Sequence, residues 1–277
     1  MHLEVGGLSI TATYLITAAR IWSANDVRPK DAGKAPLSEA SSTEIKYRVL
    51  VADDHPLFRE ALVECVRRTI PAAEILEAWD LATLQAAITA STEFDLLLLD
   101  LNMPGVNGLS TLVHVHALAP GIAVIVVSDV DNSALVPRAL ALGAAGFIAK
   151  SSLMSTIGKT LTTVLAGGVS IPVSDSKAEL QGHSLSAVEI HAARRVGALT
   201  PQQYRIATLL TGGLHNKQIG WELGITEATV KAHISSIFQV LRVRNRTQIA
   251  LLIQVLDFER SSQMHSYGRD WGMLETL

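Results

Sequence analysis

Apolar and polar residues follow two different patterns along the chain, one up to about residue 167 and another from about residue 198. In the first part, short apolar runs alternate with stretches of helical periodicity. The runs predict five strands, at Arg48–Ala52, Glu74–Ala78, Leu96–Leu99, Ala123–Val127 and Gly146–Ala149. The stretches predict helices at Pro56–Thr69, Leu81–Ser91, Gly108–Leu118, Ser133–Leu142 and Met154–Ala166. Such alternation predicts an α/β fold with a doubly wound, five-stranded parallel sheet of flavodoxin-like type.

The second pattern is helical throughout. It predicts four helices, at Pro201–Thr211, Asn216–Leu223, Glu227–Leu241 and Thr247–Phe258. Thr200 before Pro201 and Thr226 before Glu227 are typical helix starts. Gly224 suits a tight turn between the second and third of these helices. The chain therefore joins an α/β domain to a smaller all-α domain.

These patterns divide the chain into five segments. Residues 1–45 form an N-terminal extension that is expected to be partly disordered, because residues 23–42 are rich in Ser, Ala, Pro and Lys. The α/β domain is predicted at 46–167, a linker with one short helix (Ala187–Val196) at 168–197, and the helical domain at 198–260. A C-terminal tail follows at 261–277.

Composition and charge narrow the class of protein. A length of 277 residues fits two domains, and the net charge of −3 argues against a protein that is basic throughout. Between Leu199 and Arg260, however, seven Lys and Arg residues face four acids. The one cysteine, Cys65, cannot form an intramolecular disulfide, and no apolar stretch reaches the roughly 18 residues that span a bilayer. We expect a cytoplasmic protein without a membrane segment.

Acidic residues end two of the predicted strands. Asp53 and Asp54 follow the first strand, and Asp100 follows the third. In a doubly wound sheet these strand ends lie close together, and converging carboxylates repel one another unless a cation neutralises them. Oxygen ligands from a few carboxylates are what Mg²⁺ prefers. Taken singly, each acidic cluster is equally compatible with a helix cap or a turn.

The motifs at these strand ends resemble the receiver domain of bacterial two-component response regulators. The matching elements cover Lys46 to Ala166 and are Val51-Ala52-Asp53-Asp54-His55-Pro56, Leu98-Leu99-Asp100-Leu101-Asn102-Met103-Pro104-Gly105, Val126-Val127-Ser128 and Gly146-Phe147-Ile148-Ala149-Lys150. Each element ends a different predicted strand, so the four together are a specific signal.

This resemblance implies a role for each matching residue. Asp100 is then the phosphoacceptor, taking a phosphoryl group from a phosphohistidine on a sensor histidine kinase. The implied Mg²⁺ ligands are Asp53, Asp54, Asp100 and the backbone carbonyl of Asn102. Lys150 is implied to pair with the phosphoryl group, and the Ser128 hydroxyl to bind it once attached. Phe147 matches the aromatic residue that the family repacks, although core packing explains it equally well.

Asp129 departs from the family pattern, which usually has a small residue after Ser128. A carboxylate at this position, with Asp131 nearby, is expected to oppose an incoming phosphoryl group. The alternative is a receiver that is controlled by protein contacts without phosphorylation.

The helical part resembles the LuxR and NarL group of helix-turn-helix domains. The closest blocks are Asn216-Lys217-Gln218-Ile219-Gly220, Leu223-Gly224-Ile225-Thr226, Thr229-Val230-Lys231-Ala232-His233-Ile234 and Val243-Arg244-Asn245-Arg246-Thr247. Departures are Gln202-Gln203-Tyr204, where a Glu is common, and Ser235, where a second basic residue is frequent.

The predicted helix Glu227–Leu241 is the candidate recognition helix. Its apolar stripe is Val230, Ile234, Ile237, Phe238 and Leu241, and its other face carries small and polar side chains suited to the major groove. The candidate DNA contacts are Lys217, Thr226, Thr229, Lys231, Ala232, Ser235, Arg244 and Arg246. The last helix, with Ala250, Leu251, Ile253 and Leu256, is the candidate surface of a homodimer that binds double-stranded promoter DNA.

These features favour a transcription regulator over an enzyme. The first predicted strand is followed by Asp53-Asp54-His55-Pro56, with no Gly-rich loop for a nucleotide. No zinc-ligand or Ser/His/Asp spacing stands out among the nine histidines. We therefore expect a phosphorylation-controlled, DNA-binding response regulator.

Overall fold

The computed structural model describes residues 47–91, 93–129, 135–171 and 185–256. The predicted N-terminal extension (1–45), the C-terminal tail (261–277), Asp131 and residues 172–184 of the predicted linker lie outside these residues.

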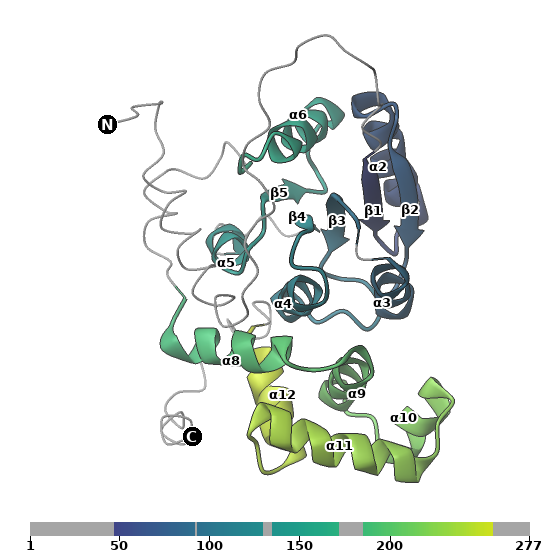
Figure 1. Cartoon of the computed structure of the whole chain (residues 1–277), viewed down its shortest axis with the longest axis vertical. Helices are drawn as coiled ribbons and strands as arrows, with labels where there is room; N and C mark the ends of the chain where they lie inside the picture. Colours follow the sequence, from purple (N-terminus) through teal and green to yellow (C-terminus); the bar gives the residue numbers. More distant parts are fainter. Residues whose placement is uncertain (1–46, 92, 130–134, 172–184, 257–277) are drawn as a thin grey trace.

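Five parallel strands form one sheet in the order β2-β1-β3-β4-β5 (Figure 1). They are β1 (Arg48–Ala52), β2 (Glu74–Ala78), β3 (Leu96–Asp100), β4 (Ala123–Ser128) and β5 (Gly146–Ala149). Because β1 lies between β2 and β3, the chain reverses its winding direction at β1 and β3. The predicted doubly wound sheet is confirmed, and the carboxyl ends of β1 and β3 lie side by side.

Helices cover both faces of the sheet. Helices α2 (Pro56–Thr69) and α6 (Met154–Leu165) cover one face, where alternate strand residues such as Val49 and Val51 are buried. Helices α3 (Leu81–Ala90), α4 (Leu109–Leu118) and α5 (Leu135–Ala141) cover the other, where Leu50 and Ala52 are buried. Because both faces are covered, the inner strands β1, β3 and β4 are nearly continuous apolar runs, whereas the edge strand β2 contains Glu74 and Glu77.

The predicted bounds of strands and helices are confirmed to within a residue or two in the described part of this domain. Two strands are one residue longer than predicted, since β3 includes Asp100 and β4 includes Ser128. Both polar residues continue the ladder, Asp100 opposite Val127 and Ser128 opposite Ala149. The ends of these strands therefore hold the polar side chains in fixed positions.

The second part is helical, as predicted. It contains α8 (Ala187–Gly197), α9 (Pro201–Thr211), α10 (Asn216–Leu223), α11 (Glu227–Leu241) and α12 (Arg246–Gln254). The Thr200 and Thr226 side chains cap α9 and α11, and Gly224 ends α10 in the left-handed conformation, with φ of 64°. The prediction that the last helix reaches Phe258 is wrong at that end, because α12 stops at Gln254.

The two parts pack against each other. Helix α8 lies along α4, and α9 contacts α3, so that one apolar cluster continues from the sheet into the helical part. Helix α11 lies on the side of the helical part that is turned away from the sheet (Figure 1). Among the described residues, no helix has the length and apolar character needed to cross a membrane.

Candidate functional site

The acidic site lies where β1, β3 and β5 end. The side chains of Asp53 and Asp100 are completely buried, and that of Asp54 is 28% exposed. Lys150, the residue after β5, reaches into the same place with a side chain that is only 9% exposed. Parallel pairing of β1 with β3 and of β4 with β5 brings these residues together from distant parts of the sequence.

Lys150 is the central cation of this site. Its Nζ lies 2.9 Å from Asp100 Oδ2 and 3.0 Å from Asp53 Oδ2. Two buried carboxylates thus share one ammonium group, which leaves a net negative charge. The predicted proximity of Asp53, Asp100 and Lys150 is confirmed.

The site changes the acidity of its groups. Burial raises the pKa of Asp100, while hydrogen bonds from Lys150 and the Asn102 amide partly offset that rise. Burial lowers the pKa of Lys150, but its contacts with Asp100 and Asp53 outweigh burial, and the pKa is raised. Lys150 therefore stays protonated at neutral pH, as a partner for anions.

The donor set fits a divalent cation. Asp53, Asp54, His55 and Asp100 each offer a ligand atom, and these atoms lie within 4.8 Å of one another. Asp53 Oδ2 is buried without a well-directed hydrogen bond, although Lys150 Nζ lies close by. Mostly carboxylate donors, with room for water at the exposed edge, match the preference of Mg²⁺.

Simple capping does not explain the acids. The N-cap of α2 is His55, and no side chain caps this helix. Asp53 Oδ1 accepts the His55 amide hydrogen at 2.8 Å, which fixes the carboxylate and turns its other oxygen towards Lys150.

The other predicted receiver residues lie around this group. The Asn102 amide donates to Asp100 Oδ1 at 3.0 Å, while the Asn102 side chain is exposed. Ser128 is 1% exposed at the end of β4, and its carbonyl accepts the Lys150 amide at 2.8 Å. Phe147 is buried in the apolar cluster of the sheet.

Two further residues border the site. The Asp129 side chain is 54% exposed, and its Oδ2 lies 4.0 Å from Lys150 Nζ, so this carboxylate faces the site. His55 was not predicted as a site residue, yet its Nδ1 lies 2.8 Å from Asp54 Oδ1 and 3.2 Å from Lys150 Nζ. The sequence feature that could have indicated this role is the position of His55 directly after Asp53 and Asp54.

The predicted DNA contacts form a second set of residues, in the helical part. All eight side chains are exposed: Lys217, Thr226, Thr229, Lys231, Ala232, Ser235, Arg244 and Arg246. Lys231 Nζ pairs with Glu227 Oε1 at 2.9 Å, one turn earlier on α11. This pairing lowers the pKa of Glu227. The Arg246 guanidinium donates to the Leu214 carbonyl at 2.8 Å, while Thr226 also caps α11.

The apolar stripe of α11 packs inward. Val230, Ile237 and Leu241 are completely buried, and Ile234 and Phe238 pack against them. Ile253 in α12 and Leu256, two residues after its end, are also completely buried. They belong to the core of the chain itself, so of the predicted dimer residues only Ala250 and Leu251 keep exposed surface.

The departure at Gln203 has a structural explanation. Gln203 closes a capping box with Thr200, since its Oε1 accepts the Thr200 amide hydrogen at 2.9 Å. Its Nε2 donates to Ser236 Oγ at 2.9 Å and so joins α9 to α11. A glutamine can do both, whereas a glutamate cannot donate the second bond.

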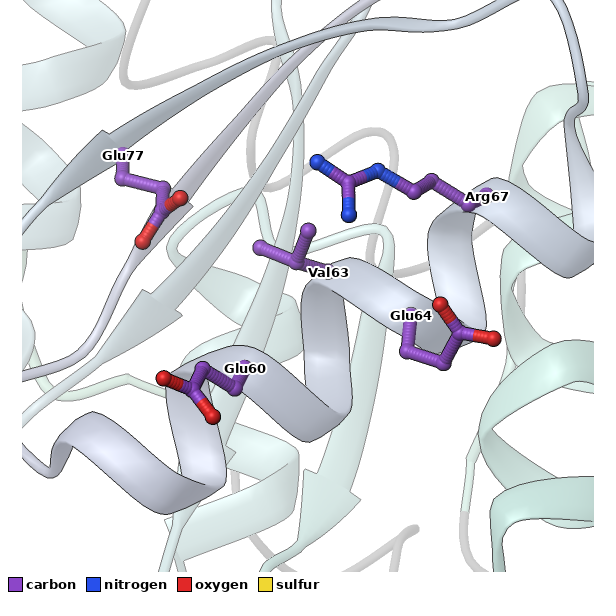
Figure 2. A pocket seen from close by; sticks show the side chains of 5 residues that line it. All are labelled: Glu60, Val63, Glu64, Arg67 and Glu77. Atoms are coloured by element: carbon purple, nitrogen blue, oxygen red, sulfur yellow. The ribbon is translucent and has the colours of Figure 1, made fainter.

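A hollow between α2 and β2 is lined by none of the predicted site residues. Figure 2 shows the five side chains around it, Glu60, Val63, Glu64, Arg67 and Glu77.

Comparison with known proteins matches both parts of the chain to known families. Residues 49–162 match the response regulator receiver domain, and residues 197–253 match the luxR family of bacterial regulatory proteins. A glycerol metabolism activator of Pseudomonas putida is 38% identical over 219 residues, which cover 76% of this chain and 97% of the relative. The chain belongs to the response regulators that carry a LuxR-type DNA-binding domain.

One further relative supports this family assignment, and solved structures of similar sequence are also known. The nitrate/nitrite response regulator NarL of Escherichia coli K12 is 31% identical over 205 residues, covering 74% of this chain and 94% of NarL. Among solved structures, RcsB of Salmonella enterica serovar Typhimurium, bound to promoter P1flhDC with the phosphomimetic BeF3-, is 21% identical. The superposition covers 76% of this chain and 98% of the RcsB chain, with a TM-score of 0.45.

Proposed function

We propose that this regulator accepts a phosphoryl group on Asp100 from a sensor histidine kinase and that the modification controls its binding to promoter DNA. The observation that carries the proposal is a buried Asp100 carboxylate in contact with Lys150, inside a donor set that fits Mg²⁺. A buried, negatively charged group of this kind needs a functional explanation, since burial without full neutralisation is costly.

The proposed transfer is an in-line displacement. An Asp100 carboxylate oxygen attacks the phosphorus of a phosphohistidine, an O–P bond forms, the P–N bond breaks, and the histidine nitrogen keeps the electron pair. Lys150 neutralises charge on the phosphoryl oxygens, and the Ser128 hydroxyl donates a hydrogen bond to one of them. Asp53, Asp54, Asp100 and the Asn102 carbonyl would hold a Mg²⁺, which would supply further charge neutralisation.

We propose that α11 enters the major groove through its exposed face. Lys231, Ala232 and Ser235 are small or extended enough to approach base edges, and Lys217, Thr226, Thr229, Arg244 and Arg246 contact phosphates around them. The excess of basic residues in this part is modest, so two copies on paired half-sites are needed for tight binding.

Intact-mass measurement tests the phosphorylation step. The wild-type chain, incubated with Mg²⁺ and acetyl phosphate, is expected to gain the mass of one phosphoryl group. Asp100→Asn is expected to gain none, because the amide is not a nucleophile of comparable strength. Equal modification of both proteins would rule out Asp100 as the acceptor.

A comparison of two lysine substitutions tests the DNA interface. Lys231→Ala is expected to weaken binding to promoter DNA about tenfold and to lower its dependence on salt. Lys159→Ala removes another exposed lysine, from α6, and is expected to leave binding unchanged. Equal binding by wild type and Lys231→Ala would place the interface elsewhere.

A second candidate function is regulation without phosphorylation. It is favoured by Asp129, whose carboxylate lies 4.0 Å from Lys150 Nζ and competes with a phosphoryl group for this cation. In that case the wild-type chain gains no mass with the phosphodonor, and Asp100→Asn binds DNA as well as the wild type does.

A further inference from the structure

A tyrosine of the DNA-binding domain is inserted into the receiver beside the loop that follows Asp100. Tyr204, on α9, is completely buried, and its hydroxyl lies 2.8 Å from Ser110 Oγ and 3.0 Å from Thr111 Oγ1. Both partners lie in the first turn of α4 and are themselves completely buried. Water therefore cannot replace these hydrogen bonds in the packed state.

The hydrogen bonds of these hydroxyls have defined directions. Ser110 Oγ donates to the Asn107 carbonyl at 2.6 Å, so it accepts from Tyr204. Tyr204 has one hydroxyl proton, which goes to Ser110, so Thr111 Oγ1 donates to Tyr204 while it accepts the Asn107 amide hydrogen at 3.1 Å. The four bonds form a closed ring that begins and ends on the backbone of Asn107. We call it the Asn107–Tyr204 ring.

The aromatic ring of Tyr204 has its own partner. It stacks on His114 with the ring centroids 4.1 Å apart and the planes at 14°. Gln85 Nε2 lies 3.1 Å from His114 Nε2 and donates to the Pro201 carbonyl at 3.3 Å, which ties α3 to the start of α9. Replacing Tyr204 by Phe therefore keeps the stacking and removes only the hydroxyl from the Asn107–Tyr204 ring.

The Asn107–Tyr204 ring lies at the far end of the loop that starts at Asp100. At the near end, the Asn102 amide donates to Asp100 Oδ1. Midway, the Pro104 carbonyl accepts the Leu81 amide hydrogen at 3.0 Å, and the loop ends where α4 begins at Leu109. A phosphoryl group on Asp100 changes the charge and the hydrogen bonding of the carboxylate, so it acts on the first residues of this loop.

A second set of contacts, made by Arg138, also joins the receiver to the helical part. Arg138, on α5, pairs with Glu189 of α8 at 2.6 Å and donates to the Val255 carbonyl, just after α12, at 2.9 Å. The receiver thus contacts α8, α9 and the end of α12, while the predicted DNA contacts on α11 stay exposed. The receiver therefore fixes the orientation of the helical part but does not cover the predicted DNA contacts on α11.

We propose that the Asn107–Tyr204 ring is a latch through which the loop after Asp100 holds the DNA-binding domain, and that phosphorylation of Asp100 opens it. Opening frees the domain to rotate, so that two copies can align on paired half-sites. This inference rests on the proposed function, because it needs Asp100 to be the acceptor.

The test uses the full-length chain and two variants that each remove one hydroxyl from the ring. Tyr204→Phe and Thr111→Val keep size and shape, and they lie on opposite sides of the interface. Without phosphodonor, each is expected to exchange amide hydrogens in the first turn of α4 and in α9 about tenfold faster than the wild type. Each is also expected to bind promoter DNA about tenfold more tightly than the unmodified wild type.

Controls separate the latch from general destabilisation and from the proposed function. Tyr47→Phe removes a phenolic hydroxyl from the α2 side of the sheet and is expected to leave exchange in α4 and α9 unchanged. Acetyl phosphate with Mg²⁺ is expected to raise the same exchange in the wild type and to have little further effect on Tyr204→Phe.

Two results would overturn the latch. One is slow, wild-type exchange in both variants. The other is a wild type that gains the phosphoryl mass but keeps slow exchange in α4 and α9. A wild type that gains no phosphoryl mass contradicts the proposed function instead, and mass measurement identifies that outcome directly.

Discussion

One ammonium group, that of Lys150, connects the carboxylates of the acidic site. It contacts Asp53 and Asp100, which are both buried, and it lies within ion-pair distance of the half-exposed Asp129. In the proposed function, a phosphoryl group on Asp100 would pair with the same cation and so compete with Asp53 and Asp129 for it. We therefore expect the charges around Lys150 to set how readily the site accepts a phosphoryl group.

Removal of the Asp129 carboxylate is expected to speed phosphorylation of Asp100. Asp129→Ala is expected to raise the rate of phosphorylation by acetyl phosphate about threefold, because an exposed charge at this distance has a small, screened effect. Intact-mass time courses measure the rate. Glu93→Ala is the matched control. It removes an exposed acid just before β3, at the end of the strand that lies away from Asp100. An unchanged or lower rate in Asp129→Ala would show that Asp129 does not oppose the transfer.

The bounds of individual strands and helices were the most predictable feature of this structure. Strands such as β1 and helices such as α9 are continuous apolar runs or capped periodic segments, and local residues determine both. The end of α12 was not predictable, because its apolar periodicity continues to Leu256 after the helix stops at Gln254. Arg138, more than 100 residues earlier, binds the Val255 carbonyl there, and no local pattern indicates it.

The turn between α10 and α11 depends on a glycine inside a helix. A Cβ on Gly220 would lie 2.8 Å from the Ile225 carbonyl oxygen, which is shorter than a van der Waals contact. Helix propensity alone favours alanine by about 1 kcal/mol. We expect the clash to win, so that Gly220→Ala lowers the free energy of unfolding by about 1–3 kcal/mol and weakens DNA binding.

Thermal unfolding and a DNA-binding titration measure these two effects. Gly121→Ala is the control, since a Cβ there meets no atom within 4 Å. A Gly220→Ala protein that is more stable than the wild type would contradict the close approach of α10 to the turn.

Helix α4 carries two buried histidines that make stability depend on pH. Burial lowers the pKa of His114 and of His116 from 6.5 to about 4. The unfolded chain therefore binds protons that the folded chain cannot, and stability is lost as the pH falls from 6.5 towards 4. The loss at pH 5 is roughly 2 kcal/mol for each histidine.

Urea unfolding at pH 7.5 and pH 5 measures this loss. Carboxylates titrate in the same range, so the informative quantity is the difference between variants. His116→Gln keeps a donor for the Gly143 carbonyl and removes one titrating ring, so its stability is expected to fall less between the two pH values. An equal fall in His116→Gln and wild type would mean that this ring is protonated in the folded state.

At the scale of the whole molecule, two domains are held together while the predicted DNA contacts remain exposed. The acidic site was predictable, because its residues lie in motifs within one domain, whereas the DNA contacts stay a prediction. The joint between the domains was not predictable, since Tyr204 and its partners Ser110 and Thr111 are more than 90 residues apart. Burial of Ile253 and Leu256 likewise depends on packing beyond α12.

In the proposed function, the state of Asp100 controls DNA binding through α11. Purified wild type, Asp100→Asn and Lys231→Ala can each be mixed with fragments of the source genome, with and without Mg²⁺ and acetyl phosphate. The bound fragments are then sequenced. We expect the phosphodonor to enrich a defined set of fragments for the wild type only. An identical enrichment with Asp100→Asn would contradict control of DNA binding by Asp100.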